Sequence, residues 1–290
     1  MKPCPFDYVR PHSLDEACSI LDGDEDAQII AGGQTLVPML AMRLARPSRL
    51  VDVMRILELD RLVEEGQAIC VGAATRQVVI ERSALVAAKL PLLAQAIAWV
   101  GHPPTRSRGT VGGSIANADP SAEIPLVATA LEAELVVRTK ANESRMNPGD
   151  FFLGPMMTAI EAGGVLKEIR FPVWSGRVGA SFQEVSARRG DFAFVAAAAQ
   201  VRLNEAGVCE AATIALGGVA DHPTRLRSAS AALIGGRLAE REIDEALADE
   251  IGAIEALADH HVSAEYRRRV ARLLARRALC EARERARRGP

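Results

Sequence analysis

Aromatic side chains are scarce in this sequence. Only 4% of the 290 residues are Phe, Trp or Tyr, although 49% are apolar. The interior must therefore be built mainly from Ala, Val, Leu and Ile. A chain of this length and apolar content is long enough to bury one large core or the cores of two domains.

Cysteines are few, odd in number and scattered. No two of them stand in C-x-x-C spacing, which argues against a disulfide framework or a cysteine-ligated zinc site. The expected setting of the protein is a reducing cytoplasm. The five cysteines are Cys4, Cys18, Cys70, Cys209 and Cys280.

The sequence also lacks a charge excess, long apolar runs and the common phosphate-binding motifs. The formal net charge of −2 gives no argument for a nucleic-acid partner or an anionic membrane surface. No apolar run reaches the roughly 18 to 20 residues of a membrane span, and the opening residues MKPCPFDYVRP lack the apolar segment of a signal peptide. Neither G-x-G-x-x-G nor G-x-x-x-x-G-K-[ST] occurs, which disfavours a Rossmann site and a P-loop.

The stretch up to about residue 59 is predicted to be compact α/β. Ser13 is predicted to cap a helix over residues 14–21, with Glu16 completing a capping box. Strands are predicted at residues 29–30 and 50–53, and a helix at 36–45 between them.

From about residue 60 to residue 172 the pattern is mixed α/β. Thr75 is predicted to cap a helix that runs to Glu81, and residues 150–152 are predicted to lie in a loop. The other predicted elements are helices at 92–100 and 126–131 and strands at 69–71, 134–138 and 165–171.

After Pro172 the pattern changes to a β-meander followed by helices, an α+β arrangement. The last helix is rich in arginine, yet its acidic neighbours Glu265 and Glu281 favour a solvated or subunit-docking face over a nucleic-acid element. The predicted elements are a linker at 174–179, strands at 181–185, 194–203 and 209–216, and helices at 240–257 and 263–279.

Two diglycine turns, about eighty residues apart, are the most informative feature of the chain. The first lies in AQIIAGGQTLVPML (27–40) and the second in RGTVGGSIANADPSAEIP (108–125). Glycine lets consecutive backbone N–H groups converge on one point, and such a concavity binds anions, usually phosphate. Two of them predict one pyrophosphate gripped from both sides, in a dinucleotide site that does not use the Rossmann turn.

Several features near these turns have competing interpretations. A single Gly-Gly after a strand is usually only a tight turn. Asp119 and Glu123 follow the second turn and are expected either to accept from a ribose hydroxyl or to complement the helix dipole. The segment GGSIA (112–116) weakly resembles a nucleophile elbow, but the histidines that follow do not suit a serine triad. His102 has two interpretations, a covalent flavin attachment site and a plain loop residue, and its context favours the loop residue.

The two turn segments resemble the signature segments of the medium, FAD-binding subunit of molybdenum hydroxylases. This is the family of aerobic carbon monoxide dehydrogenase and xanthine dehydrogenase. The matching residues are AGGQTLVPMLAMRLARPSRLVDV (31–53) and GTVGGSIANADPSAEIP (109–125). FDYVRPHSLDEA (6–17), GDFFLGPMMTAI (149–160) and FQEVSARRGDFAFVAAAAQV (182–201) fit as well, so the resemblance covers nearly the whole chain.

The resemblance implies an α+β fold in which two α/β subdomains form an FAD-binding unit of the vanillyl-alcohol-oxidase type. This unit is expected at residues 1–174, with subdomains at about 1–59 and 60–174. A C-terminal antiparallel sheet with helices is expected at 178–290. The residues expected at the FAD are Ile30, Ala31, Gly32, Gly33, Gln34, Thr35, Leu36, Val37, Thr110, Val111, Gly112, Gly113, Ser114, Asp119, Glu123, Leu166 and Gln183.

By the same resemblance the chain is one subunit of an oxidoreductase. A large subunit would carry molybdopterin, a small subunit would carry two 2Fe-2S clusters, and FAD on this chain would pass electrons to an external acceptor. The expected assembly is a dimer of heterotrimers, and no side chain of this subunit is assigned a catalytic role or a metal. Gln183 lies where some relatives carry a lysine, which leaves its role open, and the scattered cysteines argue against the extra iron–sulfur cluster of the benzoyl-CoA reductase type.

Two alternatives remain at this point. One is a self-sufficient flavin oxidase of the same fold with its own substrate pocket. The other is a binding module that has lost its flavin, against which the intact glycines and their hydroxylic neighbours speak.

Overall fold

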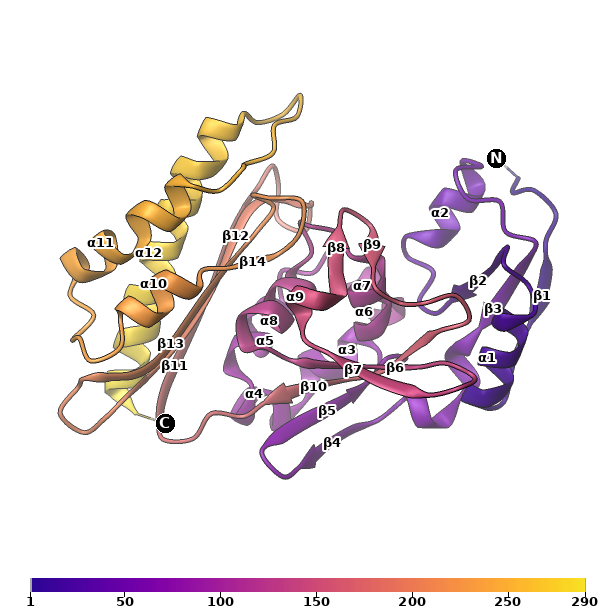
Figure 1. Cartoon of the computed structure of the whole chain (residues 1–290), viewed down its shortest axis with the longest axis horizontal. Helices are drawn as coiled ribbons and strands as arrows, with labels where there is room; N and C mark the ends of the chain where they lie inside the picture. Colours follow the sequence, from indigo (N-terminus) through magenta and orange to yellow (C-terminus); the bar gives the residue numbers. More distant parts are fainter. Residues whose placement is uncertain (1, 290) are drawn as a thin grey trace.

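The computed structural model describes residues 2–289. Its strands form three main sheets that follow one another from one end of the molecule to the other, with helices between and over them (Figure 1). The N-terminal sheet lies at one end, and the C-terminal sheet with its long helices lies at the other.

The N-terminal sheet is parallel and has the order β1-β3-β2. Helix α1 (Leu14–Asp22) joins β1 (Asp7–Val9) to β2 (Ala27–Ile30), and α2 (Leu36–Ala41) joins β2 to β3 (Arg49–Asp52). Parallel neighbours need such crossover connections. Two short 3-10 turns, η1 (Val53–Arg55) and η2 (Leu57–Leu59), then lead into the central sheet.

The ends of these helices follow local chemistry. The Ser13 hydroxyl accepts from the Glu16 N–H at 3.1 Å, which confirms the predicted cap. The Glu16 carboxylate accepts from the His12 N–H at 2.8 Å, one residue before the usual partner in a capping box. Helix α2 ends at Ala41, not at residue 45, because Arg43 adopts a left-handed conformation with φ 59°.

The central sheet is antiparallel and has the order β4-β5-β10-β6-β7. Its strands are β4 (Leu62–Glu65), β5 (Ala68–Gly72), β6 (Glu134–Arg138), β7 (Glu143–Met146) and β10 (Val165–Pro172). The helices between β5 and β6 in the chain are α3 (Gln77–Arg82), α4 (Ala84–Lys89), α5 (Pro91–Ala96), α6 (Pro103–Arg108), α7 (Val111–Asn117) and α8 (Glu123–Leu131). A short helix α9 (Pro148–Phe151) and a small hairpin, β8 (Phe152–Gly154) with β9 (Met157–Thr158), follow β7.

Two predictions in this region are wrong. Thr75 does not cap a helix, because its hydroxyl donates to the Arg61 carbonyl at 3.0 Å and α3 begins only at Gln77. Residues 150–152 are not a loop, because Asn147 caps α9 through the Asp150 N–H at 3.1 Å and β8 begins at Phe152. In both places, hydrogen-bond partners distant or upstream in sequence decide the local structure.

The C-terminal sheet is antiparallel and has the order β11-β12-β13-β14. Its inner face lies against α5 and α8, and its outer face is covered by the C-terminal helices (Figure 1). Alternate residues of β12 therefore enter different cores: Ala196 and Ala198 pack with α8, whereas Ala197 and Val201 pack with α12. The elements are β11 (Arg177–Ser186), β12 (Ala193–Leu203), β13 (Cys209–Gly217), β14 (Thr224–Arg225), α10 (Arg227–Ala232), α11 (Glu240–Gly252) and α12 (Ala264–Arg288).

Small residues set the close approach of α12 to this sheet. A Cβ added at Gly179 would overlap the Ala282 carbonyl oxygen of α12. Strand β11 begins at Arg177, inside the segment predicted as a linker, because Arg177 and Val178 already pair with β12. The three predicted strands and two predicted helices of this part are confirmed, with shifted ends.

Candidate functional site

The first diglycine turn presents free backbone donors. It connects β2 to α2, and its residues Gly32 to Thr35 are partly or fully exposed. Within residues 2–289, the N–H groups of Gly32, Gly33, Gln34 and Thr35 have no hydrogen-bond acceptor, although the Gly33 carbonyl accepts from the Val37 N–H at 3.0 Å. Gly33 has φ +68°, a conformation that glycine adopts without steric cost. Consecutive free amides of this kind form an anion-binding concavity.

The second diglycine turn is built differently. Thr110 caps α7, and its hydroxyl accepts from the Gly113 N–H at 3.0 Å. The Val111 and Gly112 N–H groups donate to the Thr75 and Ala73 carbonyls at 3.0 and 2.9 Å. Most amides of this turn are therefore engaged within the chain, whereas Gly113 is exposed and Ser114 half-buried at its surface.

The two turns touch each other. A Cβ added at Gly32 would overlap the Arg108 carbonyl oxygen and lie 2.7 Å from Gly109 Cα. On the other side, a Cβ at Gly109 would lie 2.5 Å from Gln77 Oε1, and the Gln77 N–H donates to the Gly109 carbonyl at 2.9 Å. The structure thus brings the two predicted segments together, with the free amides of the first beside the start of the second.

Leu166 precedes Lys167, which is linked to the second turn through two successive backbone hydrogen bonds. Leu166 is buried on β10, next to an irregularity in the pairing of β10 with β6 between Leu166 and Glu168. The Lys167 carbonyl accepts from the Ala73 N–H at 2.9 Å, and the Ala73 carbonyl accepts from Gly112. The bulge therefore helps to fix the position of α7.

Arg106 supports the segment before the second turn and was not singled out from the sequence. Its side chain is buried and donates to the Glu81 carboxylate at 2.8 and 3.0 Å. It also donates to the carbonyls of Val100 and Gly101 at 3.0 and 3.1 Å. The hydrogen bonds from Arg106 lower the pKa of Glu81 below its ordinary value.

Replacement of Arg106 by alanine is expected to destabilise the chain by about 3 kcal/mol, because the Val100 and Gly101 carbonyls and the Glu81 carboxylate lose their donor. The loss should shrink as the pH falls below the ordinary glutamate pKa of 4.5, because the lowered pKa of Glu81 contributes stability only while this carboxylate is ionised. Urea unfolding at pH 7 and in acid measures both effects. Arg82→Ala removes an exposed arginine that directly follows Glu81 and should leave stability within about 0.5 kcal/mol. An equal loss in both variants would contradict the supporting role of Arg106.

Glu123 lies at the start of α8 and is buried, with a relative exposure of 9%. Burial, with a smaller contribution from the nearby Asp119 carboxylate, raises the pKa of Glu123 to about 7, although a backbone N–H and Arg106 oppose the rise. Burial also raises the pKa of Asp119, whose Oδ1 accepts from the Ser121 N–H at 2.9 Å. The Asp119 side chain thus stabilises the turn before α8.

The side chain of Gln183 lies on the face of the C-terminal sheet that is turned away from α8 and Glu123. On β11 it opposes Ala197, which packs toward α12, and its amide donates to the Ser181 hydroxyl at 3.2 Å. That hydroxyl in turn donates to Glu281 of α12 at 3.0 Å. The next residue, Glu184, opposes Ala196 and faces α8 instead. His102 is exposed and packs against Gly190, so that a Cβ at Gly190 would lie 2.7 Å from its Cε1.

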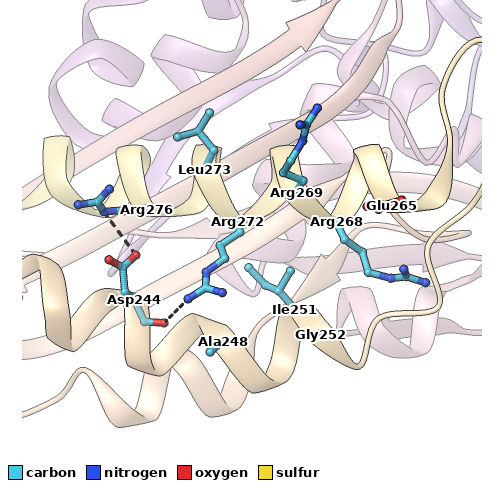
Figure 2. A pocket seen from close by; sticks show the side chains of 10 residues that line it. All are labelled: Asp244, Ala248, Ile251, Gly252, Glu265, Arg268, Arg269, Arg272, Leu273 and Arg276. Carbon is cyan, nitrogen blue, oxygen red and sulfur yellow. Dashed lines mark hydrogen bonds and ion pairs between the residues drawn. The ribbon is translucent and has the colours of Figure 1, made fainter.

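A hollow of about 520 Å³ lies elsewhere, between α11 and α12 on the outer side of the C-terminal sheet (Figures 1 and 2). Its arginines are partly engaged within the chain. Arg276 pairs with Asp244 at 3.4 Å, and Arg272 donates to the Asp244 carbonyl at 3.4 Å (Figure 2). This hollow is separated from the glycine turns by the C-terminal sheet, so it does not belong to the site described above.

Residues 2–289 contain no cluster of three His, Cys, Asp or Glu side chains that could hold a metal ion. In the same part of the chain, the helices are all too short or too polar to cross a membrane. The candidate site consists of two joined turns, the first with free backbone N–H groups, and of the buried Glu123 at the start of α8.

Two family models together match most of the chain. The FAD binding domain in molybdopterin dehydrogenase matches residues 4–174, and the CO dehydrogenase flavoprotein C-terminal domain matches residues 180–282. The chain is 38% identical to the 6-hydroxypseudooxynicotine dehydrogenase complex subunit alpha of Paenarthrobacter nicotinovorans, over 99% of this chain and 97% of that one. It is 35% identical to the carbon monoxide dehydrogenase medium chain of Afipia carboxidovorans, over 99% of each chain.

Solved structures agree with these relatives. A chain of carbon monoxide dehydrogenase from Hydrogenophaga pseudoflava superposes with a TM-score of 0.95 at 35% identity, covering 98% of this chain and 99% of that one. A chain of quinoline 2-oxidoreductase from Pseudomonas putida 86 gives a TM-score of 0.93 at 35% identity, with 99% of each chain covered.

Proposed function

Because the chain belongs to the FAD-binding medium subunits of molybdopterin dehydrogenases, we propose that it relays electrons from 2Fe-2S clusters of a partner subunit through FAD to an external acceptor. The expected α+β fold, with an FAD-binding unit followed by a C-terminal sheet and helices, is confirmed. The chain is thus the flavoprotein component of an oxidoreductase.

One observation carries the proposal: the free N–H groups of Gly32 to Thr35 lie beside the second glycine turn. A diphosphate fits this cradle, because its oxygens need several donors at a place where no side chain intervenes. Ser114, at the surface of α7, would add a hydroxyl donor, and Glu123 would accept from a hydroxyl of the nucleotide. FAD itself supplies the redox chemistry, since it accepts electrons singly and releases them in pairs.

The role of this chain is then to bind FAD and to orient it. Main-chain donors hold the nucleotide by its diphosphate, which leaves the position of the flavin to the surfaces of α8 and the C-terminal sheet. No acid, base or nucleophile of this chain is needed for electron transfer.

The proposal includes the partners and the organisation of the chain. A molybdopterin-binding large subunit and a 2Fe-2S small subunit would assemble with it as a dimer of heterotrimers in the cytoplasm. Several relatives are named as chains or subunits of dehydrogenases, which supports an assembly of several subunits. The division into residues 1–174 and 178–290 is part of the same proposal.

The test is flavin binding followed by reduction. The purified chain, incubated with FAD and freed of excess, is expected to show flavin absorption in the visible range, and to lose it on reduction through a co-expressed iron–sulfur partner. Small alcohols or phenols alone should not bleach it. Bleaching by such a substrate would replace the relay with a self-sufficient flavin oxidase, and a chain that retains no flavin would refute both.

A further inference from the structure

The hollow between α11 and α12 carries more positive charge than the chain itself neutralises. Four of the residues that line it are arginines of α12, and two, Asp244 and Glu265, are acidic. Arg276 pairs with Asp244 at 3.4 Å. Within residues 2–289, neither Arg268 nor Arg272 forms an ion pair, and both donate to main-chain carbonyl groups instead, at 3.1 and 3.4 Å.

Arginines near the end of the same helix are paired within it. Arg285 pairs with Glu281 at 3.3 Å, and Arg287 pairs with Glu284 at 3.2 Å. Pairs three or four residues apart are the usual way in which a helix neutralises its exposed charges. The arginines at the hollow therefore differ from those that follow them, because they keep their charge available to another molecule.

Three of these arginines form a row. Arg268, Arg272 and Arg276 follow one another at intervals of four residues, which places them on one face of α12, about 6 Å apart along its axis. Like charges at this spacing repel each other and weaken a helix. The row is thus unfavourable for the chain alone, and carboxylates from another molecule along it would offset the repulsion.

The hollow is shaped for an elongated ligand with apolar groups. Figure 2 shows the guanidinium groups of the row spread along the hollow and not aimed at one point. A single small anion is held by donors that converge on it, so this arrangement fits a row of acidic groups better. Ala248 and Ile251 of α11 line the hollow as well, and so does Leu273, whose exposed fraction of 43% is large for a leucine.

A protein segment meets both requirements. Carboxylates on alternate residues of an extended segment, or on every fourth residue of a helix, lie about 6 to 7 Å apart, which matches the row. Nucleic acid fits less well, because the lining within residues 2–289 includes no aromatic ring on which a base could stack. A second copy of this chain, docked through the same face, would bring arginine against arginine.

We propose that the hollow between α11 and α12 is the docking site for an acidic segment of a partner subunit. Carboxylates of this segment lie along Arg268, Arg272 and Arg276, and its apolar side chains lie against Ala248 and Leu273. The hollow is on the outer side of the C-terminal sheet (Figure 1), so docking leaves the glycine turns accessible to FAD. The identity of the partner as a subunit of the same enzyme rests on the proposed function, whereas the acidic chemistry of the ligand does not.

A peptide probe tests the ligand chemistry on the full chain alone. A fluorescein-labelled peptide of glutamate and leucine is expected to bind the wild type at least about tenfold more tightly than the same peptide with glutamine in place of glutamate. Added salt should weaken this preference. Arg272→Glu should abolish it, because the change puts a negative charge in the middle of the row. Equal binding of the two peptides by the wild type would refute the site.

Arg277→Glu is the matched control. Arg277 is an exposed arginine of the same helix, five residues further along and outside the lining of the hollow. The variant changes the net charge as Arg272→Glu does, yet its affinity for the acidic peptide should stay within about twofold of the wild type. Both variants should keep the wild-type Tm within a few degrees, since both arginines are exposed. Equal losses of affinity in the two variants would mean attraction to net charge alone and would overturn the proposal.

Photo-crosslinking in the assembled complex identifies the partner. Leu273 is replaced by the photo-reactive residue p-benzoylphenylalanine in the full chain, which is co-expressed with the large subunit and the 2Fe-2S subunit. The expected crosslink joins it to a partner-subunit segment rich in aspartate and glutamate. A crosslink to a second copy of this chain, to nucleic acid or to a segment without acidic residues contradicts the proposal, as does the absence of a crosslink from an assembled complex.

The docking site and the proposed function can fail separately. If the complex forms and its FAD is reduced through the 2Fe-2S subunit, but Arg272→Glu assembles with the affinity of the wild type, the docking site fails and the proposed function stands. If the wild type prefers the acidic peptide and Arg272→Glu does not, but no complex forms with these subunits, the proposed function fails. The partner is then not one of these subunits, and only the site for an acidic segment stands.

Discussion

Gly33→Val is expected to reduce FAD affinity at least about 100-fold, a loss of roughly 2.7 kcal/mol. Two effects combine. Gly33 has φ +68°, which a β-branched residue adopts only with strain, so the turn would change conformation and its free amides would diverge. In addition, the new side chain would stand beside the N–H groups from Gly32 to Thr35, where the diphosphate is proposed to bind. Equilibrium titration of the purified chain with FAD measures the loss.

Gly66→Val provides a matched control for backbone strain. Gly66 has φ +61°, and nothing lies within 4 Å of an added Cβ. It stands in the turn between β4 and β5, away from the glycine turns. The control should lose stability to a similar extent and yet bind FAD like the wild type. If both variants bind FAD normally, the diphosphate does not lie on the first turn.

The elements of the C-terminal part were largely predictable, because both faces of its strands are buried and its helices have an apolar stripe. The run Ala193 to Leu203 reads as a strand since its alternate residues enter two cores. The Ser13 cap was also predictable, because its chemistry is local. The short strands β4 and β7 were not identified, since they are polar edge strands whose residues are mostly exposed.

The glycine turns of the candidate site were predictable from the sequence. The contacts that these turns make with residues far apart in the chain were not. The two turns were found from their sequence pattern, but the contact of Gly32 with Arg108 and Gly109 joins residues far apart in the chain. Thr75 was wrongly predicted to cap a helix, because its hydroxyl donates instead to the Arg61 carbonyl. The face of the sheet on which Gln183 lies depends on the register of β11 with β12, which a single sequence does not reveal.

The engaged amides of the second turn revise how the two turns are expected to act. Both were predicted to supply clusters of free N–H groups, yet Val111, Gly112 and Gly113 already donate within the chain. The first turn therefore carries the main-chain donors, and the second provides a closely packed wall with the Ser114 hydroxyl at its surface. The proposed grip on the diphosphate depends on how tightly the two turns are joined.

Gly32→Ala tests that junction. The added methyl would overlap the Arg108 carbonyl oxygen and approach Gly109 Cα, and both are backbone atoms that cannot rotate away. Overpacking of this kind costs about 2 kcal/mol, so the Tm of the FAD-free chain should fall by about 4 to 8 °C. FAD affinity should fall at least about tenfold in addition, because the free amides would move away from the second turn. Differential scanning calorimetry and FAD titration measure the two losses separately.

Gly252→Ala is the control for an added methyl without a collision. Gly252 lies at the end of α11, and nothing stands within 4 Å of its new Cβ. This variant should be as stable as the wild type or more so, since alanine favours the helix over glycine by up to about 1 kcal/mol, and its FAD affinity should be unchanged. A Gly32→Ala chain that loses stability but binds FAD normally would show that the two turns support the fold together while only one of them holds the nucleotide. If Gly32→Ala loses both stability and FAD affinity while Gly252→Ala loses neither, the contact of Gly32 with Arg108 and Gly109 supports both folding and FAD binding. This contact is possible only because residue 32 has no side chain.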